Sequence, residues 1–180
     1  MARRRRPEEE PSRPLHDGPV ILGIDPGSLI TGYGLLCDHD GEVQLLEFGT
    51  LRPRRRTDFS SRLADIYDGL CDLIDETQPD EIAIESCFQH KNVRTALLIG
   101  HVRGVILLAA AQSGARVFEY TPVEVKMAVA GSGAATKHQV QFMIERLLTA
   151  DVGKPSPDEA DALAVALCHL HRRTLIEALS

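Results

Sequence analysis

Four acidic residues stand where elements of secondary structure are predicted to end or begin. Asp25 follows the apolar run "VILGI" and precedes the turn signal "PG", and Glu85 closes the shorter apolar run "EIAIE". Asp158 and Asp161 lie three residues apart at the start of the last predicted helix, so they share one helix face. If the first and fourth strands are neighbours and the last helix lies across their ends, the four carboxylates converge.

Converging carboxylates repel one another, which raises some of their pKa values unless cations neutralise them. Oxygen ligands suit Mg²⁺ or Mn²⁺, and no His or Cys cluster in the sequence suggests zinc. Two such ions about 4 Å apart activate a water and stabilise the leaving oxygen when a phosphodiester is hydrolysed. The acids therefore predict two-metal-ion phosphodiester hydrolysis.

Each acid also has a simpler interpretation. Asp25 can bond its own backbone in a turn, Glu85 can be a solvated residue at a strand end, and Asp158 can stabilise the helix dipole. Asp161 is harder to explain in this way, because it lies one turn into the helix and is followed by "ALA". We interpret the four as one site because a single explanation then covers all of them.

The hydrophobic pattern indicates the elements that position these acids. It predicts an α/β fold with a five-stranded mixed sheet, in the order β-β-β-α-β-α-β-α, flanked by helices. Turn signals make the first three strands a meander. Strands are predicted at 19–24, 31–37, 42–51, 81–86 and 116–120, and helices at 58 to the stop signal at 78–80, 92–113, 122–130, 136–149 and from 156.

Two capping boxes mark helix starts. Thr136 and Gln139 form one of them, and Ser156 and Glu159 form the other, with Pro157 at the first helical position. The second box places the acidic pair in the first turns of the last helix.

Composition fits one domain of 180 residues, with 43% hydrophobic and 26% charged residues. We expect a charged, Pro-rich tail at 1–18 that does not order itself, a folded domain at 19–173 and a C-terminal tail at 174–180. The formal net charge of −6 argues against nucleic-acid affinity from bulk charge alone, so DNA binding would need local basic patches.

The cysteines and the apolar segments indicate the compartment. The four cysteines are far apart without zinc or redox spacing, which favours free thiols in a reducing compartment. The basic run at 3–6 is followed by "PEEE" rather than by an apolar signal segment. The most apolar window, 102–111, is too short to span a membrane. We expect a cytoplasmic protein without a membrane segment.

Five segments taken in order resemble one family. The set is similar to the RuvC family of Holliday-junction resolvases, members of the ribonuclease-H-like superfamily. The resemblance implies a homodimeric, divalent-metal-dependent endodeoxyribonuclease that nicks two opposed strands of a four-way DNA junction symmetrically. It also implies work in recombination and DNA repair beside a branch-migration motor complex. The segments are "ILGIDPGSLITGYGLL" at 21–36, "IAIESCFQHKN" at 82–92, "ALLIGHVRGVILLAA" at 96–110, "VFEYTPVEVKMAVAGSGAATKHQV" at 117–140 and "DEADALAVA" at 158–166.

The resemblance places the family's acidic tetrad on Asp25, Glu85, Asp158 and Asp161. It implies that Asp25 bridges the two ions and that the other three acids complete the coordination. Some relatives carry His at the position of Asp158, so aspartate there is a permitted variant.

The DNA contacts follow in part from the same resemblance. Lys126 and Lys137 flank the loop "GSG" at 131–133 and match positions that the family uses near the scissile phosphates. Phe88 resembles an aromatic wedge that stacks on a base at the junction centre, although a small core aromatic under a loop is the simpler interpretation. Further basic candidates, for which a solvated surface charge is the simpler interpretation, are Lys91, Arg94, Arg103 and the run at 52–56.

The histidines and the long helix receive weaker assignments. His138, beside Lys137, can contact phosphate or assist a proton transfer. His169 and His171 lie late in the last helix, where a cation is favourable, and are given no role in a site. Small residues on the 92–113 helix, such as Gly100, predict the surface where two copies meet.

Three other functions share features with this sequence. A phosphotransferase or ATPase of the actin and sugar-kinase type shares a turn like "DPGS", but it needs a second such half, which the chain lacks. A non-catalytic junction-binding scaffold predicts a broken tetrad, whereas all four positions are acidic. A related nuclease for another branched substrate is compatible with the fold, and only the matches at Phe88 and at Lys126 to Lys137 favour four-way DNA.

Overall fold

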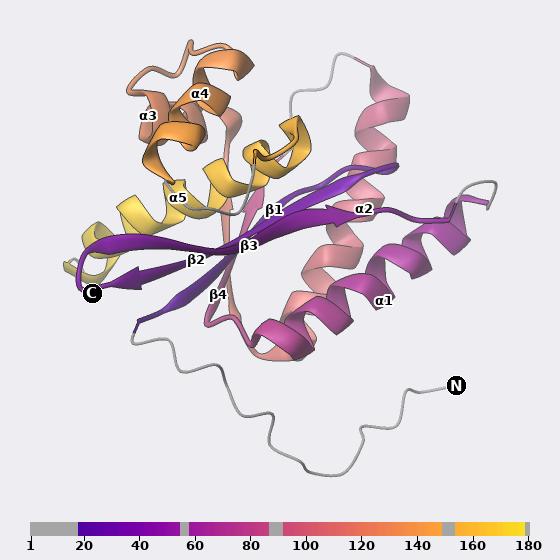
Figure 1. The fold of residues 1–180 in the computed structure, drawn as a ribbon. Coiled ribbons are helices and arrows are strands. Elements are labelled where there is room, and N and C mark those ends of the chain that lie inside the picture. Colours follow the sequence, from indigo (N-terminus) through magenta and orange to yellow (C-terminus); the bar gives the residue numbers. More distant parts are fainter. Residues whose placement is uncertain (1–17, 55–57, 87–91, 149–153, 179–180) are drawn as a thin grey trace, which may run out of the picture.

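A five-stranded mixed sheet forms the centre of the computed structural model, which describes residues 18–54, 58–86, 92–148 and 154–178 (Figure 1). The strand order is β3-β2-β1-β4-β5. The first three strands are antiparallel, and β4 and β5 continue the sheet parallel to β1. The predicted meander is confirmed. The first and fourth strands are neighbours, which is the condition on which the predicted convergence of the acids depends. The strands are β1 (Val20–Asp25), β2 (Thr31–His39), β3 (Glu42–Leu51), β4 (Glu81–Glu85) and β5 (Arg116–Tyr120).

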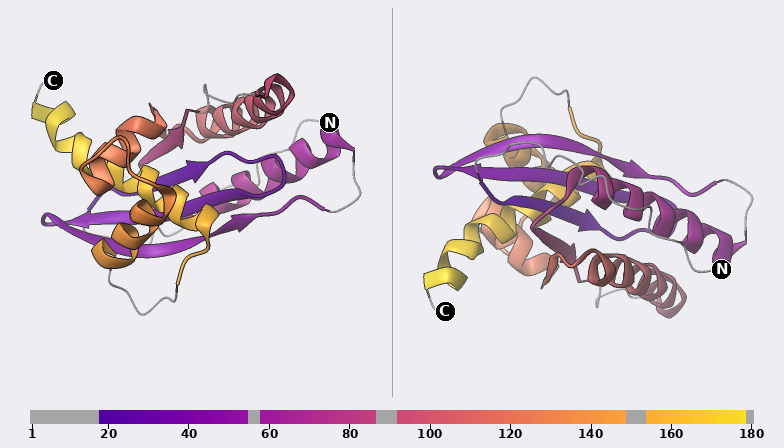
Figure 2. Two further views of the ribbon diagram at one scale, coloured as in Figure 1. Left: turned by 90° about the horizontal axis from the view of Figure 1, so that it is seen from above. Right: turned by 90° about the horizontal axis from the view of Figure 1, so that it is seen from below.

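Helices cover both faces of the sheet (Figure 2). α1 and α2 lie on one face, and α5 lies across the other face with α3 and α4 packed on its outer side. The helix α5 continues through residues 174–178, which lie in the predicted C-terminal tail. The helices are α1 (Phe59–Thr77), α2 (Val93–Ser113), α3 (Pro122–Ala130), α4 (Lys137–Leu147) and α5 (Pro157–Ala178).

Local signals explain most of the helix boundaries. Thr121 and Thr136 each form a complete capping box, with Glu124 and Gln139 as the respective partners. At α5 only half of the predicted box is present. The backbone N–H of Ser156 donates to Glu159 Oε2 at 2.6 Å, but the Ser156 hydroxyl is buried without a hydrogen-bond partner.

The helix α2 is more apolar than its place in the fold requires. By length and composition alone it could cross a membrane, which the shorter window at 102–111 did not indicate. In the fold it packs against α1, and its buried residues include Val102 and Ile106. Its other side leaves large apolar side chains in solvent, because Val93, Leu97 and Leu108 are 74%, 60% and 52% exposed.

Candidate active site

Asp25 and Glu85 end adjacent parallel strands. Ile24 pairs with Ile84 in the ladder between β1 and β4, so the next residue of each strand is the acid. Neighbouring parallel strands end at the same edge of a sheet, and because side chains alternate along both strands in step, residues at equivalent positions of the two strands point to the same face. Both carboxylates therefore leave the sheet side by side, as the sequence predicted.

Two glycines bring the other two acids to this edge. A Cβ at Gly23 in β1 would lie 2.3 Å from the carbonyl oxygen of Ala162, and a Cβ at Gly32 in β2 would lie 2.1 Å from that of Asp158. Glycine in a strand interior is expected where another backbone approaches closely. The first turns of α5, which carry Asp158 and Asp161, therefore rest almost on the sheet backbone.

The charges of the neighbouring acids act on Asp25 and Glu85. Burial, followed by the charges of Glu85 and Asp161, raises the pKa of Asp25 to about 8, and Asp158 adds to the effect. The pKa of Glu85 is also raised, by burial and then by Asp161, while a hydrogen bond between its side chain and Asp25 opposes the rise. These acids therefore lie within electrostatic reach of Asp25.

Lysine side chains offset part of this charge. The ammonium of Lys137 lies 2.5 Å from Asp161 Oδ2 and lowers the pKa values of Asp25 and Glu85. The bond to Asp161 in turn raises the pKa of Lys137. Lys126 also lowers the pKa of Glu85. Both lysines thus lie within electrostatic reach of the acids, beside the loop at 131–133.

The residues at this edge fit divalent cations by donor chemistry. Within the part of the chain that the structure describes, no three acidic, histidine or cysteine side chains are gathered closely enough to hold one ion as they lie. Instead, a carboxyl–carboxyl hydrogen bond joins Asp25 to Glu85, and a lysine pairs with Asp161. An all-oxygen set that cannot ionise fully by itself is suited to a hard cation such as Mg²⁺ or Mn²⁺.

Comparison with known proteins decides the family. The family model of the crossover junction endodeoxyribonuclease RuvC matches residues 21–169. The RuvC of Legionella pneumophila (subsp. pneumophila, strain Philadelphia 1) is 46% identical over 160 residues, which cover 89% of this chain and 91% of the relative. The chain belongs to the RuvC family. The RuvC of Moorella thermoacetica is 52% identical over 151 residues, covering 83% of this chain and 90% of the relative.

A solved RuvC structure shares the fold. The Thermus thermophilus RuvC in complex with Holliday junction substrate superposes with a TM-score of 0.78 at 30% identity, covering 87% of this chain and 95% of that chain. The predicted family, the ribonuclease-H-like fold and the class of enzyme are therefore confirmed. RuvC nucleases are endodeoxyribonucleases that act at crossover junctions and depend on divalent metal ions.

The remaining predicted RuvC contacts divide into three groups. Arg94 is exposed in the first turn of α2. Arg103 and Arg54 instead form ion pairs within the fold, with Glu119 at 2.5 Å and Asp65 at 2.7 Å. The predictions for Phe88, Lys91 and residues 55–56 lie outside the described residues.

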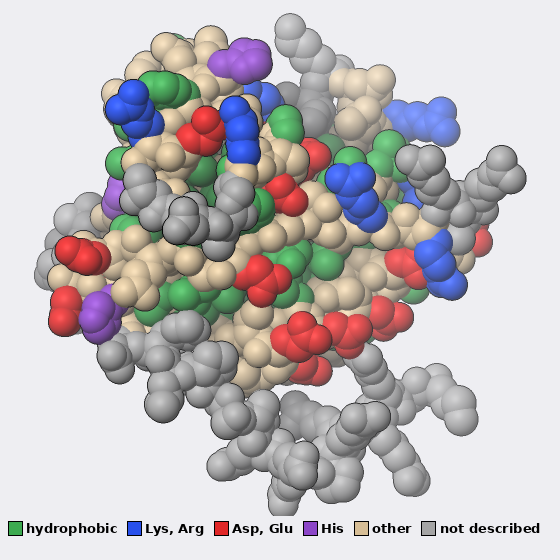
Figure 3. Space-filling model, viewed as in Figure 1, with side chains coloured by type: hydrophobic (Ala, Val, Ile, Leu, Met, Phe, Trp, Pro, Cys, Tyr) green, Lys and Arg blue, Asp and Glu red, His purple; other side chains and the backbone are tan. Residues whose placement is uncertain are grey.

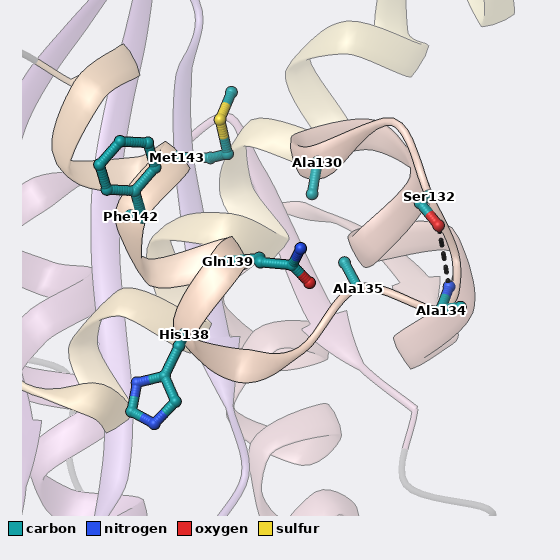
Figure 4. Close-up of a pocket in the computed structure, with 8 residues that line it drawn as sticks. All are labelled: Ala130, Ser132, Ala134, Ala135, His138, Gln139, Phe142 and Met143. Carbon is teal, nitrogen blue, oxygen red and sulfur yellow. Dashed lines mark hydrogen bonds between the residues drawn. The ribbon is translucent and has the colours of Figure 1, made fainter.

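His138 lines an open pocket of about 610 Å³ between α3 and α4 (Figure 4). The pocket lies beside the loop at 131–133, and its other lining side chains are mostly small or apolar, including Phe142 and Met143. Figure 4 shows the imidazole of His138 projecting outward from the first turn of α4. Its part in phosphate contact or proton transfer stays a prediction.

The assignment of His169 from the sequence was wrong. Its side chain is fully buried and bridges Tyr120 and Glu81, rather than acting as a cation near the end of the helix, which continues to Ala178. The helical spacing could have shown this, because His169 lies on the same face of α5 as Ala162 and Ala166, which contact the sheet at Gly23. The strand glycines were the other missed feature, and glycine inside an apolar strand was the available signal.

Proposed function

We propose that the chain resolves four-way DNA junctions by paired symmetric nicks, with Asp25, Glu85, Asp158 and Asp161 holding two divalent cations. The observation that carries this proposal is the convergence of acids at one sheet edge, where burial and mutual repulsion raise the pKa of Asp25 to about 8. The Holliday junction bound in the Thermus thermophilus complex supports the choice of substrate.

The chemistry divides between the cations and the chain. Bound Mg²⁺ or Mn²⁺ would supply water activation and charge stabilisation for phosphodiester hydrolysis. Asp25 and Glu85 give up the proton that they share in the ion-free state, since a ligand carboxylate must be ionised. Lys137 leaves Asp161 and becomes free to contact a phosphate oxygen. Close contact at Gly23 and Gly32 lets the helix of Asp158 and Asp161 lie near the sheet.

DNA is proposed to approach the edge where the acids lie. Lys126 and Lys137 supply phosphate contacts there, and Lys91 and Arg94 are further basic contacts to DNA. Phe88 is proposed to stack on a base at the junction centre. On the face drawn in Figure 3, basic side chains lie toward α3, α4 and α2, whereas acidic ones gather over α1. Such local patches can hold DNA although the whole chain is acidic.

The chain is proposed to act as a homodimer through α2. Six exposed positions of this helix recur at three- and four-residue steps, so they form one stripe along it. Small residues in the stripe permit close helix contact, and its large apolar residues gain from leaving water. Two copies joined in this way would match the two-fold symmetry of a junction. The stripe consists of Val93, Leu97, Gly100, Gly104, Leu108 and Ala111.

The cellular setting is proposed on the family resemblance alone. We propose a cytoplasmic enzyme of DNA recombination and repair that works beside a branch-migration motor complex. The choice between Mg²⁺ and Mn²⁺ is part of the experiment below.

Cleavage of a labelled four-way junction tests the function directly. The native protein and Asp25→Asn are compared in Mg²⁺ and in Mn²⁺. Asp38→Asn is the matched control, because Asp38 bonds the backbone of Gly41 in the turn at the opposite edge of the sheet. We expect paired, ligatable nicks from the native protein and from Asp38→Asn. Asp25→Asn should lose roughly 100-fold or more, the scale seen when one group that stabilises developing charge is removed.

Binding measured without divalent ions completes this test. Asp25→Asn should bind the junction within a few-fold of the native protein, because phosphate affinity comes mainly from the basic contacts. Binding without nicks by the native protein in either metal would indicate a scaffold. Equal cleavage of linear duplex would indicate the correct nuclease family with another substrate.

A further inference from the structure

A continuous chain of hydrogen bonds crosses the buried interface between α5 and the sheet. The hydroxyl of Tyr120 lies 2.6 Å from His169 Nδ1, and His169 Nε2 lies 2.6 Å from Glu81 Oε2. The three side chains are 4%, 0% and 1% exposed, and they come from β5, α5 and β4. Buried polar groups are costly unless satisfied, so a complete chain at this position calls for an explanation beyond packing.

When His169 is neutral, the hydrogen bonds of this network all donate in one direction. Burial lowers the pKa of His169, although the hydrogen bond to Glu81 opposes this, so the neutral ring is favoured. A neutral imidazole has one donor and one acceptor. His169 Nε2–H therefore donates to the Glu81 carboxylate, and Tyr120 O–H donates to Nδ1.

Two arginines complete the end of the chain at Glu81. Arg116 pairs with Glu81 Oε1, and Arg173 Nε lies 3.2 Å from Glu81 Oε2. A buried carboxylate is tolerated when it is paired and hydrogen-bonded on several sides. Glu81 is thereby a fixed anchor at the start of β4, whose other end is Glu85.

The same hydrogen-bonded residues connect the strand that carries Glu85 with the helix that carries Asp161. Tyr120 pairs with Glu85 in the sheet, and its carbonyl oxygen accepts from both the backbone N–H and the hydroxyl of Ser86, at 2.8 and 3.0 Å. His169 lies about two helical turns beyond Asp161 on α5. One tyrosine thus holds the residue after Glu85 by its backbone and the helix of Asp161 by its side chain.

We infer that Tyr120, His169 and Glu81 form a positioning network that sets how far α5 is shifted along its axis relative to β4 and β5. The inference rests on the proposed function, because the distance that the network fixes is the one between Glu85 and the acids of α5. Close contact at Gly23 and Gly32 sets how near α5 lies to the sheet. Contact with small residues resists sliding only weakly, whereas directed hydrogen bonds at a single point specify the register.

Mn²⁺ affinity of the DNA-free protein, followed by electron paramagnetic resonance of the free ion, tests the inference without cleavage. Tyr120→Phe and His169→Gln each break the bond between Tyr120 and His169. Val165→Ala is the matched control, because Val165 is fully buried on α5 but takes no part in the hydrogen bonds between Tyr120, His169 and Glu81. Thermal unfolding and metal-free junction binding are measured for every variant.

We expect Tyr120→Phe and His169→Gln to weaken Mn²⁺ binding about ten-fold, the lower end of the loss that follows when residues orienting metal ligands are removed. Junction binding without metal should be unchanged, and Val165→Ala should keep native Mn²⁺ affinity despite its lower melting temperature. The double variant should lose no more Mn²⁺ affinity than the weaker-binding single variant, since both changes remove the same bond between Tyr120 and His169.

Two results would overturn the inference. One is that the network variants lose no more Mn²⁺ affinity than Val165→Ala at an equal fall in melting temperature, and the other is that the losses of the two single variants add fully. Failure of the proposed function is recognised separately, because Asp161→Asn would then leave Mn²⁺ binding unchanged and remove the basis of the inference.

Discussion

The two faces of the sheet are packed in different ways. On the face of α1 and α2, the core consists largely of branched aliphatic side chains such as Ile66, Leu70, Ile82 and Ile84. On the face of α5, small residues replace many of them, and helix backbone meets strand backbone at Gly23. The first arrangement fills volume in the ordinary way of a protein core. The second gives up apolar volume so that a helix carrying two acids can come close to a strand that ends in a third.

The two faces of the sheet should also differ in how well they tolerate substitutions. A branched core adapts to modest changes of shape when its volume is kept. A contact between two backbones has no side chain that can move aside. The α5 face should therefore be the sensitive one, and the site lies on that face.

Alanine at Gly32 or Gly23 tests this difference most severely. The added Cβ would meet backbone atoms of α5, so α5 must move away from the sheet, and overpacking of this kind costs about 1–3 kcal/mol or more. We expect a lower free energy of unfolding in urea and a loss of junction cleavage larger than the loss of junction binding. Displacement of Asp158 and Asp161 from Asp25 is the physical reason.

Gly69→Ala in α1 is the matched change on the opposite face. Its Cβ would lie 3.4 Å from the end of the Leu51 side chain, which is an ordinary contact. Alanine is favoured over glycine inside a helix by about 0.5–1 kcal/mol, so this variant should gain stability and keep cleavage. If Gly32→Ala were as stable and as active as Gly69→Ala, the close-approach interpretation would be wrong.

The sequence predicted elements better than it predicted contacts between them. The boundaries of the strand at 42–51 and of the helix at 122–130 agree with the structure, because apolar spacing and capping residues are local signals. His169 was misassigned because its partners Tyr120 and Glu81 are 49 and 88 residues away in the chain. No local pattern reports which residue of another element will face a given side chain.

The acidic site lies between these cases. Asp25 and Glu85 could be singled out because each directly ends an apolar strand. That their strands are neighbours was only a condition of the predicted convergence, and the structure supplies it. How α5 reaches them was not predicted, since it depends on glycines in two other elements. Alternating apolar residues indicate which face of a strand is buried but not how closely a helix approaches it.

Asp25→Asn is expected to stabilise the metal-free protein above neutral pH. The pKa of Asp25 is about 8 in the folded state against an ordinary value of 3.8, so between these values the folded chain holds a proton that the unfolded chain has lost. Native stability therefore falls as pH rises through this window. The asparagine side chain does not ionise in this range, so it has no pH-dependent cost and removes the repulsion with Glu85 and Asp161.

Thermal unfolding in EDTA from pH 5 to pH 9 measures this effect. The melting temperature of Asp25→Asn should exceed the native value near pH 9, and the difference should shrink toward pH 5. A gain of about 1 kcal/mol corresponds to roughly 2–4 °C in a domain of this size. A difference that is independent of pH would show that crowding of the acids does not strain the α5 face.

The smallest effect on the folded monomer is expected at the exposed stripe of α2, on the other face. Leu97 is 60% exposed, so Leu97→Glu should change the unfolding free energy by no more than about 0.5 kcal/mol. The same change places a charge in the proposed contact between two copies, and the dimer should weaken at least ten-fold in sedimentation velocity, since an unpaired charge is costly to bury. Val123→Glu on α3, where the residue is 51% exposed, is the control and should leave association unchanged.

Equal weakening of the dimer by both variants would assign the loss to net charge. No weakening by Leu97→Glu would show that the apolar side of α2 does not have the role proposed for it. A specific loss would mean that the branched-core face carries assembly on its outer helix while the glycine-rich face carries the chemistry.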